Sequence, residues 1–218
     1  MGQIGRPIVL PIAAGLLVLS LFRIFLRSDD ATRTPPLTLD VKRAQFDGRM
    51  DADTVLVILS DLECAKCQTF ATQVLPKIES HYVAPGLLRL AFLYTANGGS
   101  TTEQDQALVR CLDQQRLFWR AYPALFTVPA SARGIPETVQ GTEKLDSLAL
   151  RNCISGYPPE EPIDIGHLLP TGGAGLPLFL IGPINKSLVI EARGVIGGGA
   201  PFEVFNQTFT ALGLGQRR

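Results

Sequence analysis

The chain has 218 residues, 46% of them hydrophobic and 18% charged, and its 20 Lys and Arg residues balance 20 Asp and Glu. This length suffices for one sizeable core plus an appendage. A chain with zero net charge has no basic field, so we do not expect nucleic acid as a partner. Its four cysteines form one close pair, Cys64 and Cys67, and two distant singles, Cys111 and Cys153. That spacing suits a redox pair plus one structural bridge.

The N-terminus carries a nearly unbroken apolar run from Pro7 to Leu26. Such a run has the length of a helix that crosses a bilayer. No small-x-small motif follows it, so we favour an uncleaved anchor over residues 1–27, with a cleaved signal peptide as the alternative. More basic residues follow the run than precede it, which by itself would place the C-terminal domain in the cytoplasm. Residues 28–45, with a Pro-Pro pair, are typical of a tether.

The first part of the globular domain, residues 46–100, contains the most informative motif. Residues 54–60 are apolar and β-branched, as in a buried strand, and helical periodicity begins at Phe70. Cys64 and Cys67 therefore lie where a helix starts, and the unpaired N–H groups and dipole there favour a thiolate on Cys64. We interpret the pair as a thiol–disulfide site. One alternative is a purely structural disulfide between Cys64 and Cys67. The other is a zinc site that would also need Cys111 and Cys153 as ligands.

Residues 87–94 are predicted to form a second core strand. Residues 101–168, which follow it, are predicted to form a helical insertion. Cys111 and Cys153 lie in two of its predicted helices. We hypothesise a structural disulfide between them, with two buried free thiols as the alternative. Phe118 and Trp119 are expected in the core rather than in a substrate platform. We assign no catalytic role to His167, because thiol exchange needs no dedicated base once the thiolate is stable.

The last part of the domain, residues 169–218, returns to short strand-like runs. Residues 177–182 and 188–192 are predicted strands about a tight turn, and three glycines at 197–199 are predicted as a further turn. Apolar residues from Phe202 to Leu212 then recur at helical spacing and predict a closing helix.

Three motifs in this order resemble the DsbA-like family of thiol–disulfide oxidoreductases over about residues 46–214. They are Ser60-Asp61-Leu62-Glu63-Cys64-Ala65-Lys66-Cys67, then Val74-Leu75-Pro76-Lys77-Ile78, and then Gly175-Leu176-Pro177-Leu178-Phe179. The resemblance implies an α/β, thioredoxin-like fold with an inserted helical domain, preceded here by the N-terminal transmembrane helix. It further implies that Cys64 is the nucleophile, that Cys67 resolves the mixed disulfide, and that Leu176 with a cis Pro177 contacts the substrate. It implies neither a cofactor nor a metal.

The chain departs from the family at two places near the cysteines. Ala65 and Lys66 stand where the family often has proline followed by an aromatic residue or histidine, and Leu176 stands where valine or threonine is more common. Lys66 is a cation beside the pair and is a candidate modulator of the site. These departures leave open whether the protein oxidises, reduces or isomerises disulfides.

The sequence therefore predicts a membrane-anchored thiol–disulfide oxidoreductase that acts on protein thiols and disulfides through Cys64 and Cys67. We expect it in the cytoplasmic (inner) membrane of a bacterium as a single-pass protein. Its domain would lie on the periplasmic side, although the flanking charges argue the other way. A membrane redox partner reached through the N-terminal helix is a further candidate. The alternative function is a non-catalytic, thioredoxin-fold accessory subunit of a membrane protein complex.

Overall fold

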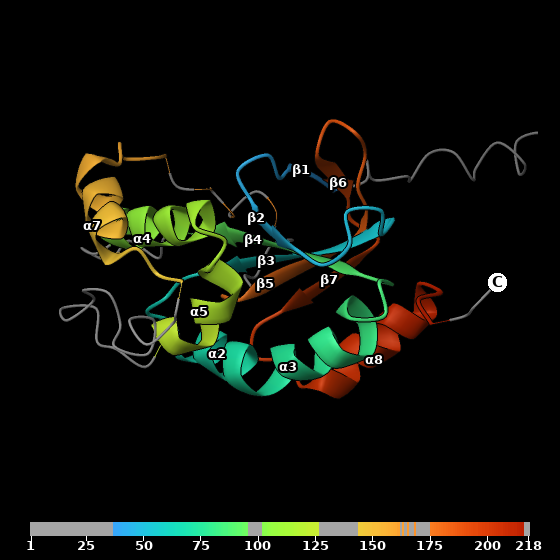
Figure 1. Ribbon diagram of the computed structural model, residues 1–218. Helices are drawn as coiled ribbons and strands as arrows, with labels where there is room; N and C mark the ends of the chain where they lie inside the picture. The colour runs from blue at the N-terminus through green and yellow to red at the C-terminus, as the bar shows by residue number, and fades with distance from the viewer. Residues whose placement is uncertain are drawn as a thin grey trace, which may run out of the picture. The chain divides into compact units, whose positions relative to one another are not determined.

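The computed structural model describes residues 37–95, 102–126, 144–161, 163, 165, 168 and 175–215 (Figure 1). All of these belong to one compact unit, residues 37–218. The predicted anchor over residues 1–27 lies outside the described residues, as does His167. Within the described part of the chain, none of the helices combines the length and apolarity needed to span a membrane.

A five-stranded sheet with the order β2-β4-β3-β5-β7 forms the centre of the domain (Figure 1). β3 is parallel to β4 and antiparallel to β5. All residues of β3 after the first are buried, which explains its continuous apolar, β-branched sequence. The strands are β2 (Gln45–Asp47), β3 (Thr54–Ser60), β4 (Arg89–Tyr94), β5 (Leu178–Pro183) and β7 (Gly194–Gly197).

The sheet has a hydrophobic core on each face because side chains alternate along its strands. On one face Leu56 and Ile58 pack with Phe70, Phe179 and Phe205 under the helices. These helices include α8 (Phe202–Ala211), as the apolar periodicity predicts. The other face carries a second core, which is covered in part by the antiparallel pair β1 (Thr38–Asp40) and β6 (Val189–Glu191).

The helical insertion connects β4 to β5. It contains α4 (Thr102–Gln114), α5 (Phe118–Leu125) and α7 (Ser147–Gly156). Phe118 is buried and stacks on Phe92 of the sheet and on Tyr122, while Trp119 packs partly buried against them. The expected core positions of Phe118 and Trp119 are therefore confirmed, and so is the α/β thioredoxin-like fold with a helical insertion.

Short strands are where the structure differs from the sequence prediction. Residues 37–45, assigned to a tether, form β1 and the turn that leads into β2, and Val41 is completely buried. β7 was also not predicted; it ends at Gly197, and the predicted glycine turn follows it at Gly198 and Gly199. These strands have three or four residues and pair with distant segments, so no local periodicity marks them. β1, for example, pairs with β6 in the register Thr38↔Glu191.

Candidate active site

The loop between β3 and the following helix places Cys64 at the helix N-terminus. Asp61 is buried, and its Oδ1 accepts a hydrogen bond from the backbone N–H of Glu63 at 2.7 Å. This side-chain turn directs the chain from the end of β3 into α2 (Ala65–Thr69), whose N-cap residue is Cys64. The predicted position of the cysteine pair, between a strand and a helix, is the one observed.

Cys64 and Cys67 form a disulfide whose Cα atoms are 5.1 Å apart. Cys64 is partly exposed, whereas Cys67 is fully buried, so an incoming thiolate reaches Cys64 first. The backbone N–H of Cys67 points at Cys64 Sγ from 3.2 Å. In the reduced protein this donor and the helix dipole stabilise negative charge on Cys64 more than on Cys67.

Pro76 interrupts the hydrogen-bond ladder of the long helix that carries the cysteines. After α2 the helix passes through the π-helical turn η2 (Phe70–Val74), α3 (Leu75–Ile78) and a second π-helical turn, η3 (Glu79–Val83). Pro76 has no N–H to donate, and around it the helix widens, with Leu75 bonding back to the carbonyl of Phe70. Phe70 and Ile78 nevertheless both stay buried in the core, which fixes the helix on the sheet.

The loop before β5 lies directly against the disulfide. The Leu176–Pro177 peptide bond is cis, and the carbonyl oxygen of Leu176 lies 3.6 Å from Cys64 Sγ. The carbonyl of Pro177 accepts a hydrogen bond from Gly198 N–H at 2.8 Å. The structure therefore brings together Cys64, Cys67, Leu176 and Pro177, although 112 residues separate Cys64 from Leu176.

Lys66 is exposed, and its alkyl chain runs beside the glycine turn that follows β7. A side chain on Gly199 would begin 3.6 Å from Cβ and Cγ of Lys66. The sequence did not predict the contact between Lys66 and Gly199, because the sequence of a glycine turn does not indicate which side chain packs against it. The ammonium group of an exposed lysine is hydrated and screened, so its effect on Cys64 through charge is modest.

Two buried hydroxyl groups lie beneath the motif, where β3 ends. The hydroxyl of Tyr122 donates to Ser60 Oγ at 3.4 Å, and Thr95 N–H donates to the Ser60 carbonyl at 3.0 Å. Burial raises the pKa of Tyr122 well above its usual value, so this phenol stays neutral in the folded protein. Tyr122 belongs to the insertion, and its contact with β3 had no signal in the sequence.

Cys111 and Cys153 form a second disulfide, with Cα atoms 5.9 Å apart. It joins α4 to α7 within the insertion, and Cys111 is buried while Cys153 is partly exposed. The four cysteines thus form two separate disulfides, and they do not converge as the zinc alternative requires. Among the described residues, no cluster of three or more His, Cys, Asp or Glu side chains could hold a metal ion.

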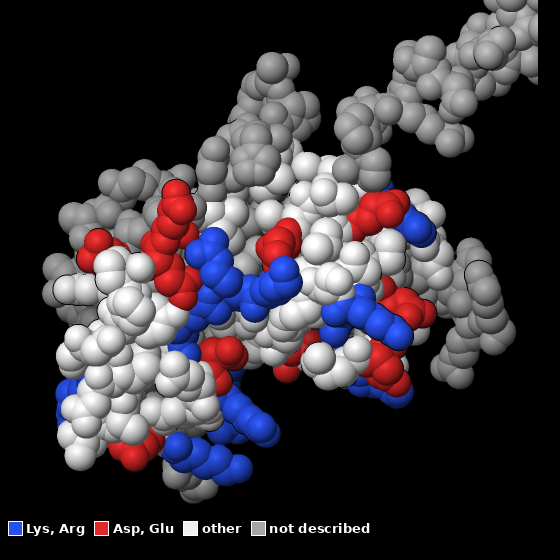
Figure 2. Space-filling model, turned by 90° about the horizontal axis from the view of Figure 1, so that it is seen from above, with Lys and Arg blue, Asp and Glu red and all other residues white. Residues whose placement is uncertain are grey.

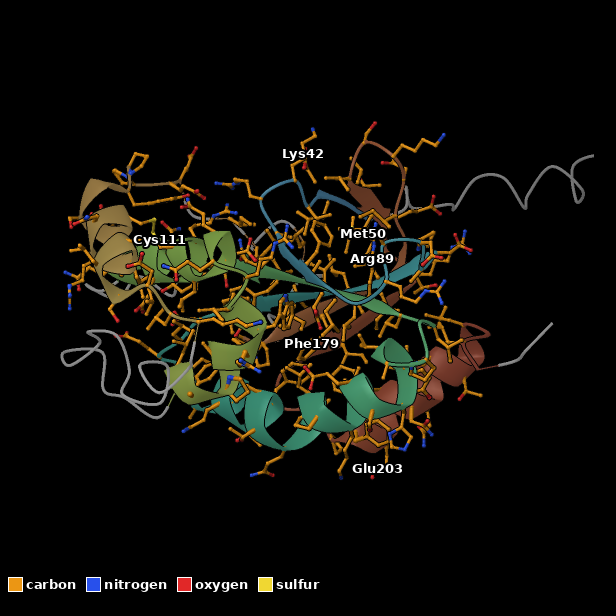
Figure 3. All side chains as sticks on the ribbon, viewed as in Figure 1. Lys42, Met50, Arg89, Cys111, Phe179 and Glu203 are labelled. Atoms are coloured by element: carbon orange, nitrogen blue, oxygen red, sulfur yellow. A yellow bond between two sulfur atoms is a disulfide. The ribbon has the colours of Figure 1, made fainter. Side chains whose placement is uncertain are left out.

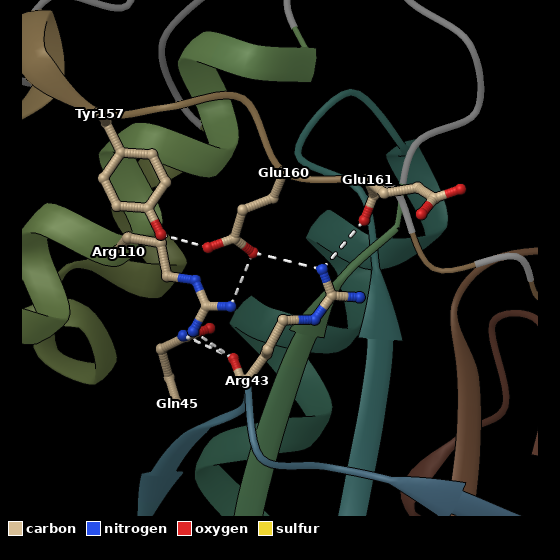
Figure 4. A network of polar contacts seen from close by, with 6 residues as sticks. All are labelled: Arg43, Gln45, Arg110, Tyr157, Glu160 and Glu161. Carbon is tan, nitrogen blue, oxygen red and sulfur yellow. Dashed lines mark hydrogen bonds and ion pairs between the residues drawn. The ribbon is translucent and has the colours of Figure 1, made fainter.

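Beside Cys111, a polar network ties the insertion to the strand region (Figure 4). Arg110 Nη2 contacts Glu160 at 2.8 Å, and the Tyr157 hydroxyl donates to the same carboxylate. Arg110 also donates to the backbone carbonyl of Arg43, whose own guanidinium lies 3.5 Å from Glu160. Burial alone would raise the pKa of Glu160, but the hydrogen bonds from Arg110 and Tyr157 outweigh it and hold that pKa below its usual value.

Comparison with known proteins agrees with this geometry. A family model described as "Thioredoxin" matches residues 41–155, about half of the chain. The chain belongs to this thioredoxin family. The comparison with curated proteins gives no match.

Solved structures similar to this chain include three bacterial proteins. Oxidised BdbD from Bacillus subtilis is 15% identical, with a TM-score of 0.58, and the match covers 82% of this chain and 98% of that one. Wolbachia pipientis alpha-DsbA1 is 18% identical, with a TM-score of 0.59 and coverages of 80% and 92%. Chlamydia trachomatis DsbA is 14% identical, with a TM-score of 0.59 and coverages of 83% and 94%.

These likenesses show the DsbA-like form of the thioredoxin fold and confirm the resemblance that the motifs carry. The match to the thioredoxin family and the Cys64–Cys67 pair agree with the predicted class of enzyme, a thiol–disulfide oxidoreductase.

Proposed function

We propose that this protein is a membrane-anchored thiol–disulfide oxidoreductase that exchanges disulfides with protein substrates through Cys64 and Cys67. The observation that carries the proposal is the contact between Cys64 Sγ and the Leu176 carbonyl across the cis-proline loop. A partly exposed sulfur beside an extended backbone segment is what an extended substrate peptide needs, because it can approach the loop while its own sulfur reaches Cys64.

With the oxidised protein, a substrate thiolate attacks Cys64 Sγ. The Cys64–Cys67 bond breaks, its electron pair leaves on Cys67, and a mixed disulfide forms between substrate and Cys64. A second substrate thiolate attacks the substrate sulfur and expels Cys64 as a thiolate. The substrate is oxidised by two electrons, and the pair is reduced. In the opposite direction, the Cys64 thiolate attacks a substrate disulfide, and Cys67 then resolves the mixed disulfide.

The test is to trap the mixed disulfide with the full-length chain in detergent. In Cys67→Ala, the Cys64 thiolate should attack a disulfide-bonded peptide dimer, expel one half as a thiolate and keep the other half as a stable adduct, visible by mass spectrometry and released by dithiothreitol. Cys64→Ala should form none, and Cys111→Ala/Cys153→Ala should exchange normally. Equal adducts in both single variants would contradict the assigned roles. A reduced Cys64 that resists alkylation and gives no turnover would favour the alternative, a non-catalytic accessory subunit.

The anchor and the periplasmic location rest on the apolar run from Pro7 to Leu26 and on the family resemblance. A membrane-impermeant maleimide should label Cys64 in intact spheroplasts after mild reduction, without lysis. Labelling that appears only after lysis would place the domain in the cytoplasm, as the flanking charges suggest. The reduction potential of the pair against glutathione would then separate an oxidant from a reductant.

A further inference from the structure

Arg89 is a buried cation without an anionic partner in the described part of the chain. It begins β4, is 5% exposed, and its Nε atom has no hydrogen-bond partner. Nη1 makes a 3.3 Å hydrogen bond to the backbone carbonyl of Met50. None of the ion pairs among the described residues includes Arg89. Burial lowers its pKa, yet an arginine remains protonated in a protein.

The groups around this guanidinium are apolar and partly open to solvent. The Met50 side chain is 70% exposed, and its sulfur lies 4.0 Å from Nη1. The ring of Phe46, on the edge strand β2, has its centroid 5.2 Å from Cζ of Arg89. We call Phe46, Met50 and Arg89 the Arg89 surface.

This combination is unfavourable for the isolated domain. A buried charge without a counter-charge loses hydration that a cation–π contact and one carbonyl replace only in part. A methionine at position 89 would fill similar space without that loss. A carboxylate supplied from outside would compensate the charge, and apolar groups beside it would cover the exposed Met50.

The Arg89 surface lies at the opposite end of the sheet from the redox pair. In Figure 3 Met50 and Arg89 lie together where β3 and β4 begin, and Cys64 follows the other end of β3. The seven residues of β3 span about 20 Å. A partner bound here therefore leaves Cys64 accessible to substrates.

We propose that the Arg89 surface docks a partner protein through a segment that presents an Asp or Glu side chain between apolar residues. The carboxylate would approach the guanidinium from the Met50 side, accept a hydrogen bond from its Nη atoms and compensate its charge, while Nε stays buried. The flanking residues would cover Met50 and Phe46. The apolar rim favours a protein over a nucleic acid. The chain has zero net charge, with 20 Lys and Arg against 20 Asp and Glu, so phosphate groups find no general attraction. On the face seen in Figure 2, basic and acidic side chains are interspersed.

The test uses Met50 as a reporter, because the chain has two methionines, Met1 and Met50. The full chain, labelled with methyl-¹³C methionine and kept in detergent, is titrated with two acetylated, amidated peptides. These are Leu-Phe-Asp-Leu-Leu and its counterpart with Asn in place of Asp. Met50→Leu assigns the Met50 methyl signal. We expect a saturable shift of that signal with the Asp peptide and at least tenfold weaker binding of the Asn peptide.

Arg89→Leu should abolish this shift while its unfolding midpoint in urea stays the same or rises, which excludes misfolding as the cause. Arg49→Leu is the matched control, because Arg49 is exposed and paired with Asp51, and it should keep the shift. Leucine is used in both variants so that Met50 stays the reporter. Equal binding of both peptides, no saturable shift, retained binding in Arg89→Leu, or the same shift with inorganic phosphate would each overturn the proposal. Thiol exchange should be unchanged in Arg89→Leu, so this test is independent of the proposed redox function.

Discussion

Removal of the Cys111–Cys153 disulfide should destabilise the protein much more than removal of the redox disulfide. The two cysteines are 42 residues apart, and in the chain-entropy model closing such a loop stabilises the folded state by about 4 kcal/mol. Cys64 and Cys67 are 3 residues apart, and the same model assigns their loop about 1.6 kcal/mol. The difference comes from the number of unfolded conformations that each loop removes.

The assay is urea unfolding of Cys111→Ala/Cys153→Ala, Cys64→Ala/Cys67→Ala and the wild type under non-reducing conditions. With a slope of about 2 kcal/mol per molar urea, the first variant should unfold at a midpoint about 2 M lower and the second at one about 0.8 M lower. The free energy of each variant is taken as its own midpoint multiplied by its own slope, because loss of a cross-link expands the unfolded chain and raises the slope. A loss below about 1 kcal/mol in the first variant, or a loss no larger than in the second, would refute the reasoning.

Three further substitutions probe the packing and polar contacts. Glu160→Gln should lower the free energy of unfolding near neutral pH. The difference from wild type should vanish as the pH falls below about 4.5, because the lowered pKa of Glu160 means that its stabilisation is lost on protonation. Asp40→Asn should show a smaller dependence of the same sign, because the hydrogen bond from Lys42 also lowers the pKa of Asp40 but that pair is exposed and screened by solvent. Tyr122→Phe should lower the free energy of unfolding by about 1 kcal/mol or less, measured by thermal unfolding, because the hydrogen bond from Tyr122 to Ser60 is long. A loss above about 3 kcal/mol would contradict this prediction. Gly182→Ala should lower the free energy of unfolding by about 1–3 kcal/mol or more, because a Cβ there would overlap the Glu191 carbonyl. Gly156→Ala is the control: a Cβ there meets no atom, so this variant should be neutral or stabilising in the same denaturation assay.

Much of the redox motif could be predicted from the sequence because it is encoded locally. The β-branched run before Cys64 specifies a buried strand, and the periodicity from Phe70 specifies a helix packed on one face. Together they put Cys64 at a helix N-terminus, where the structure finds it as the N-cap. Resemblance added what local pattern could not, namely the cis-proline loop at Leu176 and Pro177. The membrane anchor over residues 1–27 stays a prediction, because it lies outside the described residues.

Tertiary structure alone decided which distant groups meet. The approach of the Leu176 carbonyl to Cys64, the bond from Tyr122 to Ser60 and the contacts of Arg110 with Glu160 each join segments far apart in the chain. Such pairs depend on how helices and strands pack, and hydrophobic periodicity reports only whether a face is buried, not what it is buried against. The same holds for Arg89. The apolar run around Arg89 predicts its place in a strand. Only the packing of β2, β4 and the Met50 loop shows that the described residues around Arg89 supply no counter-charge.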